Sequence, residues 1–375
     1  MIKSAIHWIR QFIRLDNVLV MIGAGIIFSL IWLLEIPTDI QDHHYDLQMM
    51  LQGKHFVATF GYFLAVYILS FGIPHPYALI AGSVILLSLA VGVKYILIKK
   101  YLKIDQQKLL LLFSISLLLL TNLPGPKNFL IGQFPPNLWH NSTSIFLMPF
   151  AIGLFWQGLK YWENPSQKIA LNLLILLLIN VIIKPSFVFV FVPVFGLMSL
   201  WRWKLSKAFW RIVGVGAIAL LLIILEYVAI FQWNSFRAGP QPETGLTIAP
   251  FHVWSFHSSN IPWSLLASIA FPLSYIIIFP KRLKASFPLQ FAWALFAFGL
   301  VIFILIAETG LREYDANFIW QCYISNFLLF LVTVKDWQQN QISTTLTLSL
   351  TLLFSPHLLS GIAYLVKIFI LKNYY

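Results

Sequence analysis

Residues 39–46 read Asp39-Ile40-Gln41-Asp42-His43-His44-Tyr45-Asp46, and they come shortly after an apolar run over 17–36. This stretch holds three of the chain's 13 acidic residues and two of its nine histidines. A charged cluster at the end of a membrane helix costs free energy unless it faces water, and such clusters tend to mark functional sites. The stretch therefore predicts a membrane span before it and a site within it.

The composition places the chain among the polytopic membrane proteins. Of its 375 residues, 59% are hydrophobic and only 10% are charged, and the mean hydropathy is +0.81. A soluble domain carries about 25% charged residues. Apolar segments recur from residue 17 to residue 371, which leaves no room for a soluble domain. We therefore expect a single integral membrane domain over 1–375.

The net charge of +12 is interpreted as a topology signal and not as a sign of nucleic-acid binding. Lys and Arg concentrate in the cytoplasmic loops of membrane proteins. Residues 1–16 combine Lys3, Arg10 and Arg14 with apolar side chains, which predicts an amphipathic segment on the cytoplasmic membrane surface that is retained and not cleaved. The single Cys322 excludes an intramolecular disulfide and a thiolate metal cluster.

Apolar runs that are long enough, or nearly so, to span a membrane recur along the whole chain. They lie at 17–36, 56–72, 77–98, 109–121, 145–161, 168–183, 187–201, 211–232, 263–279, 288–307, 316–334 and 344–371. A span needs about 20 residues, so 56–72, 109–121 and 187–201 are short. The last run contains Pro356 and is expected to form two short helices or one kinked helix. The predicted fold class is all-α, a polytopic transmembrane bundle of about 11 to 13 helices.

Three basic clusters, together with the N-terminus, are expected on the cytoplasmic side. They are Lys99, Lys100, Lys103 and Lys108; Arg202, Lys204, Lys207 and Arg211; and Lys281, Arg282 and Lys284. Simple alternation from residue 109 onward satisfies this and places 122–144, 184–186, 233–262 and 308–315 on the opposite face. If both 56–72 and 77–98 crossed the membrane, however, the first basic cluster would lie on the same side of the membrane as residues 39–46. We therefore favour an incomplete crossing by 56–72.

The first non-cytoplasmic loop, at 37–55, is expected to contain an interfacial helix over 41–53 that ends at Gly53. Asp42 and Asp46 lie four residues apart and share a helix face. A carboxylate held there can act as a general base towards a hydroxyl acceptor. Asp42, His43 and Asp46 could also bind a divalent cation such as Mg or Mn, and His43, His44 and Asp46 could contact a substrate. The alternative is a solvated interfacial helix with ordinary caps.

A proline-rich and glycine-rich loop supplies a second group of polar residues. Asn137, Trp139, His140 and Asn141 offer an aromatic surface and hydrogen-bond donors, which suits a sugar. Ser142 or Thr143 could equally cap the helix at 145, and a capping role is compatible with a binding role for this loop. Two further candidate substrate-binding residues, His252 and His257, precede the helix at 263.

Three cations are candidates for binding a lipid phosphate. Lys184-Pro185-Ser186 breaks an apolar run, which places an ammonium beside a helix N-terminus where a polyprenyl phosphate or diphosphate could bind. The alternative there is a snorkelling lysine. Arg237 and Arg312 favour phosphate through bidentate hydrogen bonds. Arg312, between Glu308 and Glu313, could equally form a local ion pair.

Together these residues resemble those of the GT-C-type glycosyltransferases, polytopic bacterial membrane enzymes that use lipid-linked sugar donors. The resemblance rests on an acidic motif after the first membrane helix, Pro37-Thr38-Asp39-Ile40-Gln41-Asp42-His43, on the interfacial helix that follows it, and on the stretches at 137–143 and 184–186. It covers roughly residues 17–200. The chain lacks an unmistakable Asp-Glu or Asp-x-Asp pair, so the base stays open between Asp39 and Asp42. A second departure from better-known members is that no soluble C-terminal domain is expected in residues 1–375.

The resemblance implies an inverting enzyme that transfers a sugar from a polyprenyl-phosphate-linked donor to a glycan, lipid or protein acceptor on the non-cytoplasmic face. It would be located in the bacterial inner membrane, with no certain cofactor and with no nucleic-acid partner. Two alternatives remain open. One is a polysaccharide polymerase or ligase that uses a lipid-diphosphate oligosaccharide, and the other is a transporter or flippase for a lipid-linked glycan.

Overall fold

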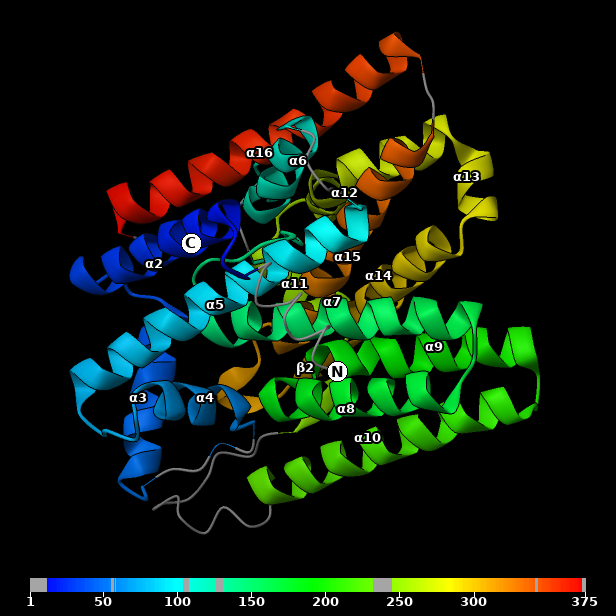
Figure 1. Cartoon of the computed structure of the whole chain (residues 1–375). Coiled ribbons are helices and arrows are strands. Elements are labelled where there is room, and N and C mark those ends of the chain that lie inside the picture. Colours follow the sequence, from blue (N-terminus) through cyan, green and yellow to red (C-terminus); the bar gives the residue numbers. More distant parts are fainter. Residues whose placement is uncertain are drawn as a thin grey trace.

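The structure is a computed structural model, and it describes residues 12–54, 57, 59–103, 108–125, 131–231, 245–340 and 343–372. Most of the amphipathic segment expected at 1–16 lies outside these residues. The described part is predominantly helical, and nine of its helices are long and apolar enough to cross a membrane, if the short 3₁₀ turns before α9 and α15 are counted with them. They are α2 (Leu15–Leu33), α5 (Pro76–Leu102), α7 (Ser142–Glu163), α9 (Val188–Trp203), α10 (Lys207–Phe231), α12 (Ile261–Ile278), α14 (Phe287–Leu305), α15 (Trp320–Gln339) and α16 (Thr344–Leu371) (Figure 1). The predicted all-α helical bundle is confirmed, and the described ranges give nine helices of spanning length where the sequence predicted about 11 to 13.

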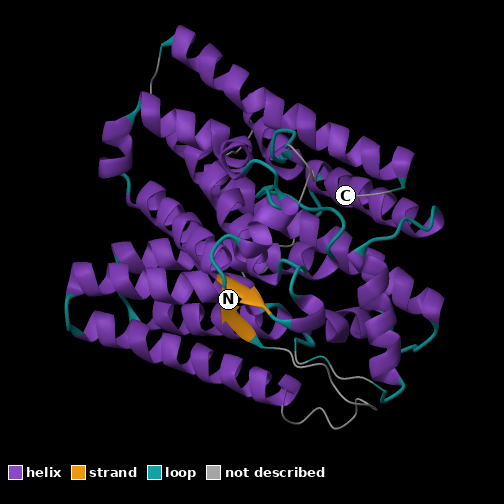
Figure 2. Cartoon of the chain, turned by 180° about the vertical axis from the view of Figure 1, so that it is seen from behind, coloured by secondary structure: helices purple, strands orange, loops and turns teal. Residues whose placement is uncertain are grey.

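Shorter elements complete the described part of the chain. They are α3 (Asp39–Leu51), α4 (Gly61–Leu69), α6 (Lys108–Leu119), α8 (Gln167–Ile183), α11 (His252–His257), α13 (Pro280–Ala285), the 3₁₀ turns η1 (Pro185–Phe187), η2 (Gly310–Arg312) and η3 (Asn317–Ile319), and the strands β1 (Leu246–Ile248) and β2 (Ile306–Glu308). The two strands pair antiparallel, with Leu246 opposite Glu308, and form the small orange sheet in Figure 2. The last apolar run forms one helix, α16, with Pro356 inside it.

Contacts between distant helices gather the basic clusters at one end of the bundle. Lys335 near the end of α15 donates to the Tyr101 carbonyl near the end of α5. The Arg202 guanidinium lies 4.5 Å from the ring centroid of Trp162, which in turn stacks on Phe287 at the start of α14. We call this the basic end. Residues 39–46 and 184–186 lie at the other end, which we call the loop end.

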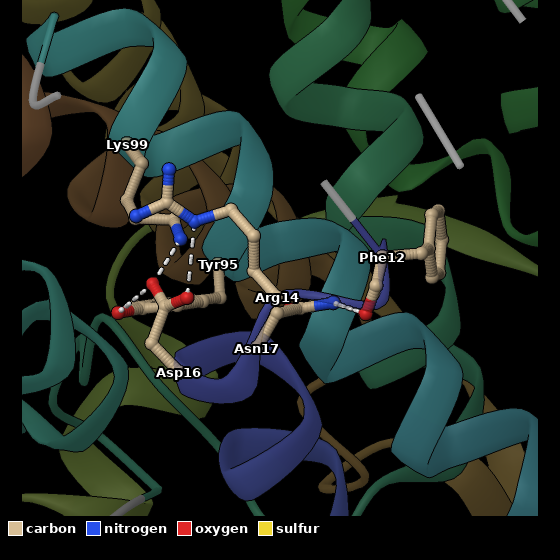
Figure 3. A network of polar contacts seen from close by, with 6 residues as sticks. All are labelled: Phe12, Arg14, Asp16, Asn17, Tyr95 and Lys99. Atoms are coloured by element: carbon tan, nitrogen blue, oxygen red, sulfur yellow. Dashed lines mark hydrogen bonds and ion pairs between the residues drawn. The ribbon is translucent and has the colours of Figure 1, made fainter. Parts of the chain in front are cut away.

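The pairing of α2 with α5 settles the crossing that the sequence left open. Figure 3 shows Asp16, in the first turn of α2, beside Lys99 in the last turns of α5. Arg14 Nε lies 3.2 Å from Asp16 Oδ1, and the Tyr95 hydroxyl donates to Asp16 Oδ2 at 3.3 Å. Both helix ends therefore lie at the basic end. α2 crosses once and α5 crosses back, so no full crossing remains for the chain between them.

α4 is the short helix between those two crossings. It has only nine residues, and at 1.5 Å per residue that is about 14 Å, which is half of a hydrocarbon core. It packs on α5, where the Tyr62 hydroxyl lies 2.8 Å from Ser83 Oγ. The sequence-based preference for an incomplete crossing by 56–72 agrees with this geometry.

Residues 120–141 differ most from the sequence-based prediction, which placed 122–144 in a loop on the face opposite the basic clusters. The described residues of this segment are irregular, and most are buried among the helices (Figure 2). His357 Nδ1 lies 2.8 Å from the Thr121 carbonyl, Ser360 Oγ donates to the Asn122 carbonyl, and the Phe134 N–H donates to Ser268 Oγ. Non-helical backbone is tolerated at membrane depth only where protein satisfies its polar groups. Polar side chains of α12, α15 and α16 do so here.

Candidate functional site

The acidic stretch begins helix α3, which crosses the direction of the long helices in Figure 1. It starts at Asp39 and ends at Leu51, two residues earlier at each end than the sequence predicted. The reason is the cap: the Thr38 N–H donates to Gln41 Oε1 at 3.0 Å, so the helix begins directly after Thr38. Ile40 and Leu47 are buried whereas Asp42 is exposed, which gives the amphipathic helix that the pattern indicated.

Asn141 connects Asp39 to the start of α7. Its side chain is 3% exposed, and Oδ1 accepts hydrogen bonds from the Ser144 N–H at 2.9 Å and the Thr143 hydroxyl at 3.0 Å. Asn141 is therefore the cap of this helix, and not Ser142 or Thr143, the two candidates that the sequence offered. Its amide nitrogen, which the cap leaves free, donates to Asp39 Oδ2. One buried side chain thus ends the loop and orients a carboxylate.

Lys184 brings a cation to the same place. α8 ends at Ile183, and Pro185 opens η1, as the sequence predicted. The Lys184 ammonium donates to Ser144 Oγ at 3.2 Å, Thr143 Oγ1 at 3.4 Å and Asn141 Oδ1 at 3.5 Å. It also lies 3.6 Å from the ring centroid of Trp320 at the start of α15. Asp39, Asn141 and Lys184 therefore form one network, which we call the Asp39–Lys184 network.

Burial controls the charge states in this network. Burial lowers the pKa of Lys184 to about 7, and the Asp39 carboxylate opposes that shift. The pKa of His140 falls to about 4, mainly through burial, with Asp39 raising it and Lys184 lowering it further. Burial is also the main cause that lowers the pKa of His43 to about 4, helped by Lys184 and opposed by Asp39. Both histidines are neutral at physiological pH, so Lys184 is the cation of the Asp39–Lys184 network.

The two histidines are held by neighbouring hydroxyls. His43 Nδ1 lies 2.7 Å from Ser142 Oγ, and its ring packs against Tyr62 and Phe63. His140 Nδ1 lies 2.6 Å from the Tyr364 hydroxyl on α16. These contacts fix the two rings beside the Asp39–Lys184 network. A neutral imidazole in a fixed position can orient a sugar hydroxyl through a hydrogen bond. It adds no positive charge to the network.

Asp42, His44 and Asp46 lie on the rest of α3. Although Asp42 is exposed as a whole residue, partial desolvation of its carboxyl first, and the Asp39 carboxylate second, raise the pKa of Asp42 above its usual range. His44 Nε2 lies 2.8 Å from Gln48 Nε2, and burial lowers the pKa of its ring. In the described ranges no three His, Cys, Asp or Glu side chains are placed to hold a metal ion. Asp42, His43 and Asp46 therefore do not form a preassembled metal site.

Asn137 and Trp139 lie deeper in the bundle. Asn137 Oδ1 accepts a hydrogen bond from Lys94 of α5, and its Nδ2 donates to the carbonyls of Leu117 and Leu120. The Trp139 side chain is 6% exposed. Both residues line a small cavity together with Ser144 and Trp320, two neighbours of Lys184. The predicted sugar-binding group is thus divided, because Asn141 and His140 adjoin the Asp39–Lys184 network whereas Asn137 and Trp139 face the interior.

The remaining predicted residues form a second cluster beside the small sheet. His252 Nε2 lies 2.6 Å from Glu313 Oε1, and His257 Nε2 lies 2.8 Å from the Tyr314 carbonyl. Arg312 pairs with Asp315 at 3.2 Å and Glu308 at 3.8 Å, which is the local ion pair that the sequence left open. Arg237 lies outside the described residues.

Three residues of the site carry no signal in the sequence. Trp320 and Ser144 contact Lys184, and Tyr364 contacts His140, although each belongs to an apolar helix. A tryptophan or a tyrosine in an apolar run usually means lipid or core packing, so only the folded chain reveals these contacts.

No protein-family model matches this chain, and no curated protein sequence matches it. The function is therefore inferred from the residues described above.

Proposed function

We propose that this chain is an integral membrane glycosyltransferase that transfers a sugar from a polyprenyl-phosphate-linked donor to an acceptor hydroxyl on the non-cytoplasmic face of a bacterial inner membrane. The observation that carries the proposal is the Asp39–Lys184 network, in which Asn141 joins a carboxylate and an ammonium. The transfer needs a base for the acceptor and a positive charge for the departing phosphate, and this pair supplies both.

Asp39 is assigned as the general base. Its carboxylate removes the proton from the acceptor hydroxyl as that oxygen bonds to the anomeric carbon of the sugar. The bond from that carbon to the phosphate oxygen breaks with inversion, and its electron pair leaves with the lipid phosphate. Asp39 is favoured over Asp42 because Asn141 orients it, whereas Asp42 is exposed.

Lys184 is assigned to the phosphate. Its ammonium is desolvated, so its attraction for a phosphate is stronger than it would be in water. Negative charge grows on the phosphate as the bond to the sugar breaks, so this interaction is stronger in the transition state than in the ground state. His43 and His140, both neutral, remain available to orient sugar hydroxyls.

An apolar cavity of about 690 Å³ supports a donor with a long hydrocarbon chain. It lies among α8, α9, α10 and α14, and its lining includes Leu173, Val188, Val192, Gly216 and Phe298. Val188 lies one helical turn after Lys184. A lipid whose phosphate binds at Lys184 could therefore place its chain in this cavity.

The test measures sugar transfer by the purified full-length chain in proteoliposomes with polyprenyl-phosphate sugars. We expect Asp39→Asn to lower the transfer rate by about 10²-fold or more, since a positioned base contributes about 10²–10⁴. Lys184→Gln should cost about 10²–10³. Asp42→Asn and Lys160→Gln are the matched controls, because Asp42 is exposed and Lys160 lies over Trp156 towards the basic end. Full activity in Asp39→Asn would contradict the proposed base, and a large loss in Asp42→Asn with full activity in Asp39→Asn would assign that role to Asp42.

The same preparation distinguishes the two alternative functions. An enzyme for diphosphate-linked oligosaccharides would lose more activity in Arg237→Ala and Arg312→Ala than in the aspartate variants. A transporter would move intact lipid-linked sugar across the liposome membrane without cleaving any bond.

A further inference from the structure

The ring of Trp320 covers one side of the Lys184 ammonium. The nitrogen lies 3.6 Å from the ring centroid, and the face of an aromatic ring attracts a cation, most strongly in tryptophan. Trp320 is the first residue of α15, whereas Lys184 directly precedes η1, and these two elements pack together. The contact therefore joins segments that are far apart in the sequence.

On another side, the ammonium donates to oxygens at the start of α7. The acceptors are Ser144 Oγ at 3.2 Å, Thr143 Oγ1 at 3.4 Å and Asn141 Oδ1 at 3.5 Å. All three oxygens are neutral, and the distances exceed the roughly 2.7–2.9 Å of an ammonium on a carboxylate. A lysine also has a long flexible stem. These three bonds therefore hold the ammonium only loosely.

The N-terminus of α7 is an unfavourable place for a cation. It is the positive end of the helix dipole, which stabilises anions and not cations. The Asp39 carboxylate attracts the Lys184 ammonium, and the face of Trp320 attracts it as well. The ring thus helps to keep a positive charge at a helix end that is suited to an anion.

Trp320 is itself held by contacts that do not involve Lys184. The η3 turn directly precedes it, and Asn317 Nδ2 of that turn donates to Glu308 Oε2 in the second cluster, at 2.5 Å. The ring also meets that of Tyr323 nearly at a right angle, with 5.5 Å between the centroids. The ammonium therefore packs on a ring that the start of α15 keeps in place.

We propose that Trp320 is a positioning residue for the lipid-linked donor: its ring holds the Lys184 ammonium at the start of α7, where the ammonium meets the donor phosphate. This role rests on the proposed function. A ring face attracts the cation without neutralising its charge, whereas a carboxylate in the same place would compete with the phosphate. The N–H groups of the ammonium can then exchange the weak α7 acceptors for phosphate oxygens.

The first experiment measures the titration of Lys184 without sugar transfer. Reductive methylation modifies a neutral amine and not an ammonium, so its extent at Lys184, read by mass spectrometry on the full-length chain in nanodiscs, gives the midpoint. The pKa of about 7 places this midpoint near pH 7 in the unmodified chain. Trp320→Leu removes the attraction for the charged form and keeps an apolar side chain. We expect it to lower the midpoint by about half a pH unit or more.

Trp320→Phe should restore part of this shift, because a phenyl face also attracts a cation, although more weakly. Trp156→Leu is the matched control, since Lys160 Nζ lies 4.8 Å from the Trp156 ring centroid towards the basic end. It should leave the midpoint of Lys184 unchanged. Trp320→Met, a second aliphatic variant, replaces Trp320→Leu if that variant does not fold.

The second experiment measures sugar transfer by the same variants. Trp320→Leu should raise the donor KM by about threefold or more and move the decline at basic pH towards lower pH, whereas Trp156→Leu should do neither. An unchanged or higher midpoint in Trp320→Leu and Trp320→Met would overturn the inference, whatever reaction the chain catalyses. A lowered midpoint in a chain that transfers no sugar would confirm the contact of the ring with Lys184. It would contradict the proposed function and, with it, the role in donor binding.

Discussion

At the residue scale, Asn141 has two roles that can be separated by substitution. Its Oδ1 caps α7, whereas its Nδ2 donates to Asp39. Asn141→Ser keeps a capping oxygen and removes the amide donor. We expect it to lower sugar transfer by about tenfold or more, with little change in stability, because a good cap is exchanged for another.

Asn260 provides the matched control for this substitution. It caps α12 through a hydrogen bond from the Trp263 N–H to its Oδ1 at 3.0 Å, and it has no recorded carboxylate partner in the described ranges. Asn260→Ser should therefore leave transfer unchanged. Equal losses in the two variants, measured as initial rates at saturating donor, would show that capping alone matters.

The titration of Lys184 predicts that sugar transfer declines on the basic side of its pH profile. Burial lowers the pKa of its ammonium to about 7, and an ammonium is charged below its pKa and neutral above it. Donor binding should therefore weaken as pH rises through about 7. Lys184→Arg keeps its charge at every accessible pH, so it should move this decline to higher pH at the cost of a lower rate. A profile that is flat from pH 6 to 9 in the unmodified chain would contradict the assignment.

At the scale of elements, the contact between α4 and α5 depends on Gly82. A Cβ added there would lie 2.7 Å from the Val66 carbonyl oxygen and 3.0 Å from the Ser70 nitrogen, both backbone atoms that cannot rotate away. Gly82→Ala should therefore push α4 from α5 and lower Tm by several degrees. Gly214→Ala in α10 is the control, because a Cβ added at Gly214 would have no other atom within 4 Å. Equal Tm values for the two variants would contradict this packing.

Element boundaries were predictable wherever local chemistry decides them. Pro185 after Lys184 predicted the break between α8 and η1, and Gly53 follows the end of α3 with φ at +68°. Asn141 was not identified as a cap, because Ser142 and Thr143 are equally good capping residues in sequence. The buried course of 120–141 was also missed. Its backbone partners, such as Ser268 and His357, come from helices far along the chain.

At the scale of the whole molecule, hydropathy and basic clusters were enough to predict the bundle and its two ends. They could not predict the Asp39–Lys184 network, because it joins α3, α7, η1 and α15. The contact of Lys184 with Trp320 spans a large sequence separation and depends on how α15 packs. The sequence could therefore nominate Asp39, Asn141 and Lys184, and only the fold brings them together.

The two ends predict a labelling pattern for single cysteines. The native Cys322 is fully buried, so the unmodified chain should give little background with a membrane-impermeant maleimide. Tyr45 and Leu311 lie at the loop end and are 61% and 83% exposed. Cysteines placed there, in Tyr45→Cys and Leu311→Cys, should therefore react in intact spheroplasts. Lys204→Cys and Lys284→Cys, at the basic end, should react only after permeabilisation. Lys103→Cys, after α5, decides the crossing: it should behave as the basic-end positions do, since α4 is too short to span. Labelling of Lys103→Cys from outside would mean that 56–72 crosses the membrane and that the pairing of Asp16 with Lys99 does not form.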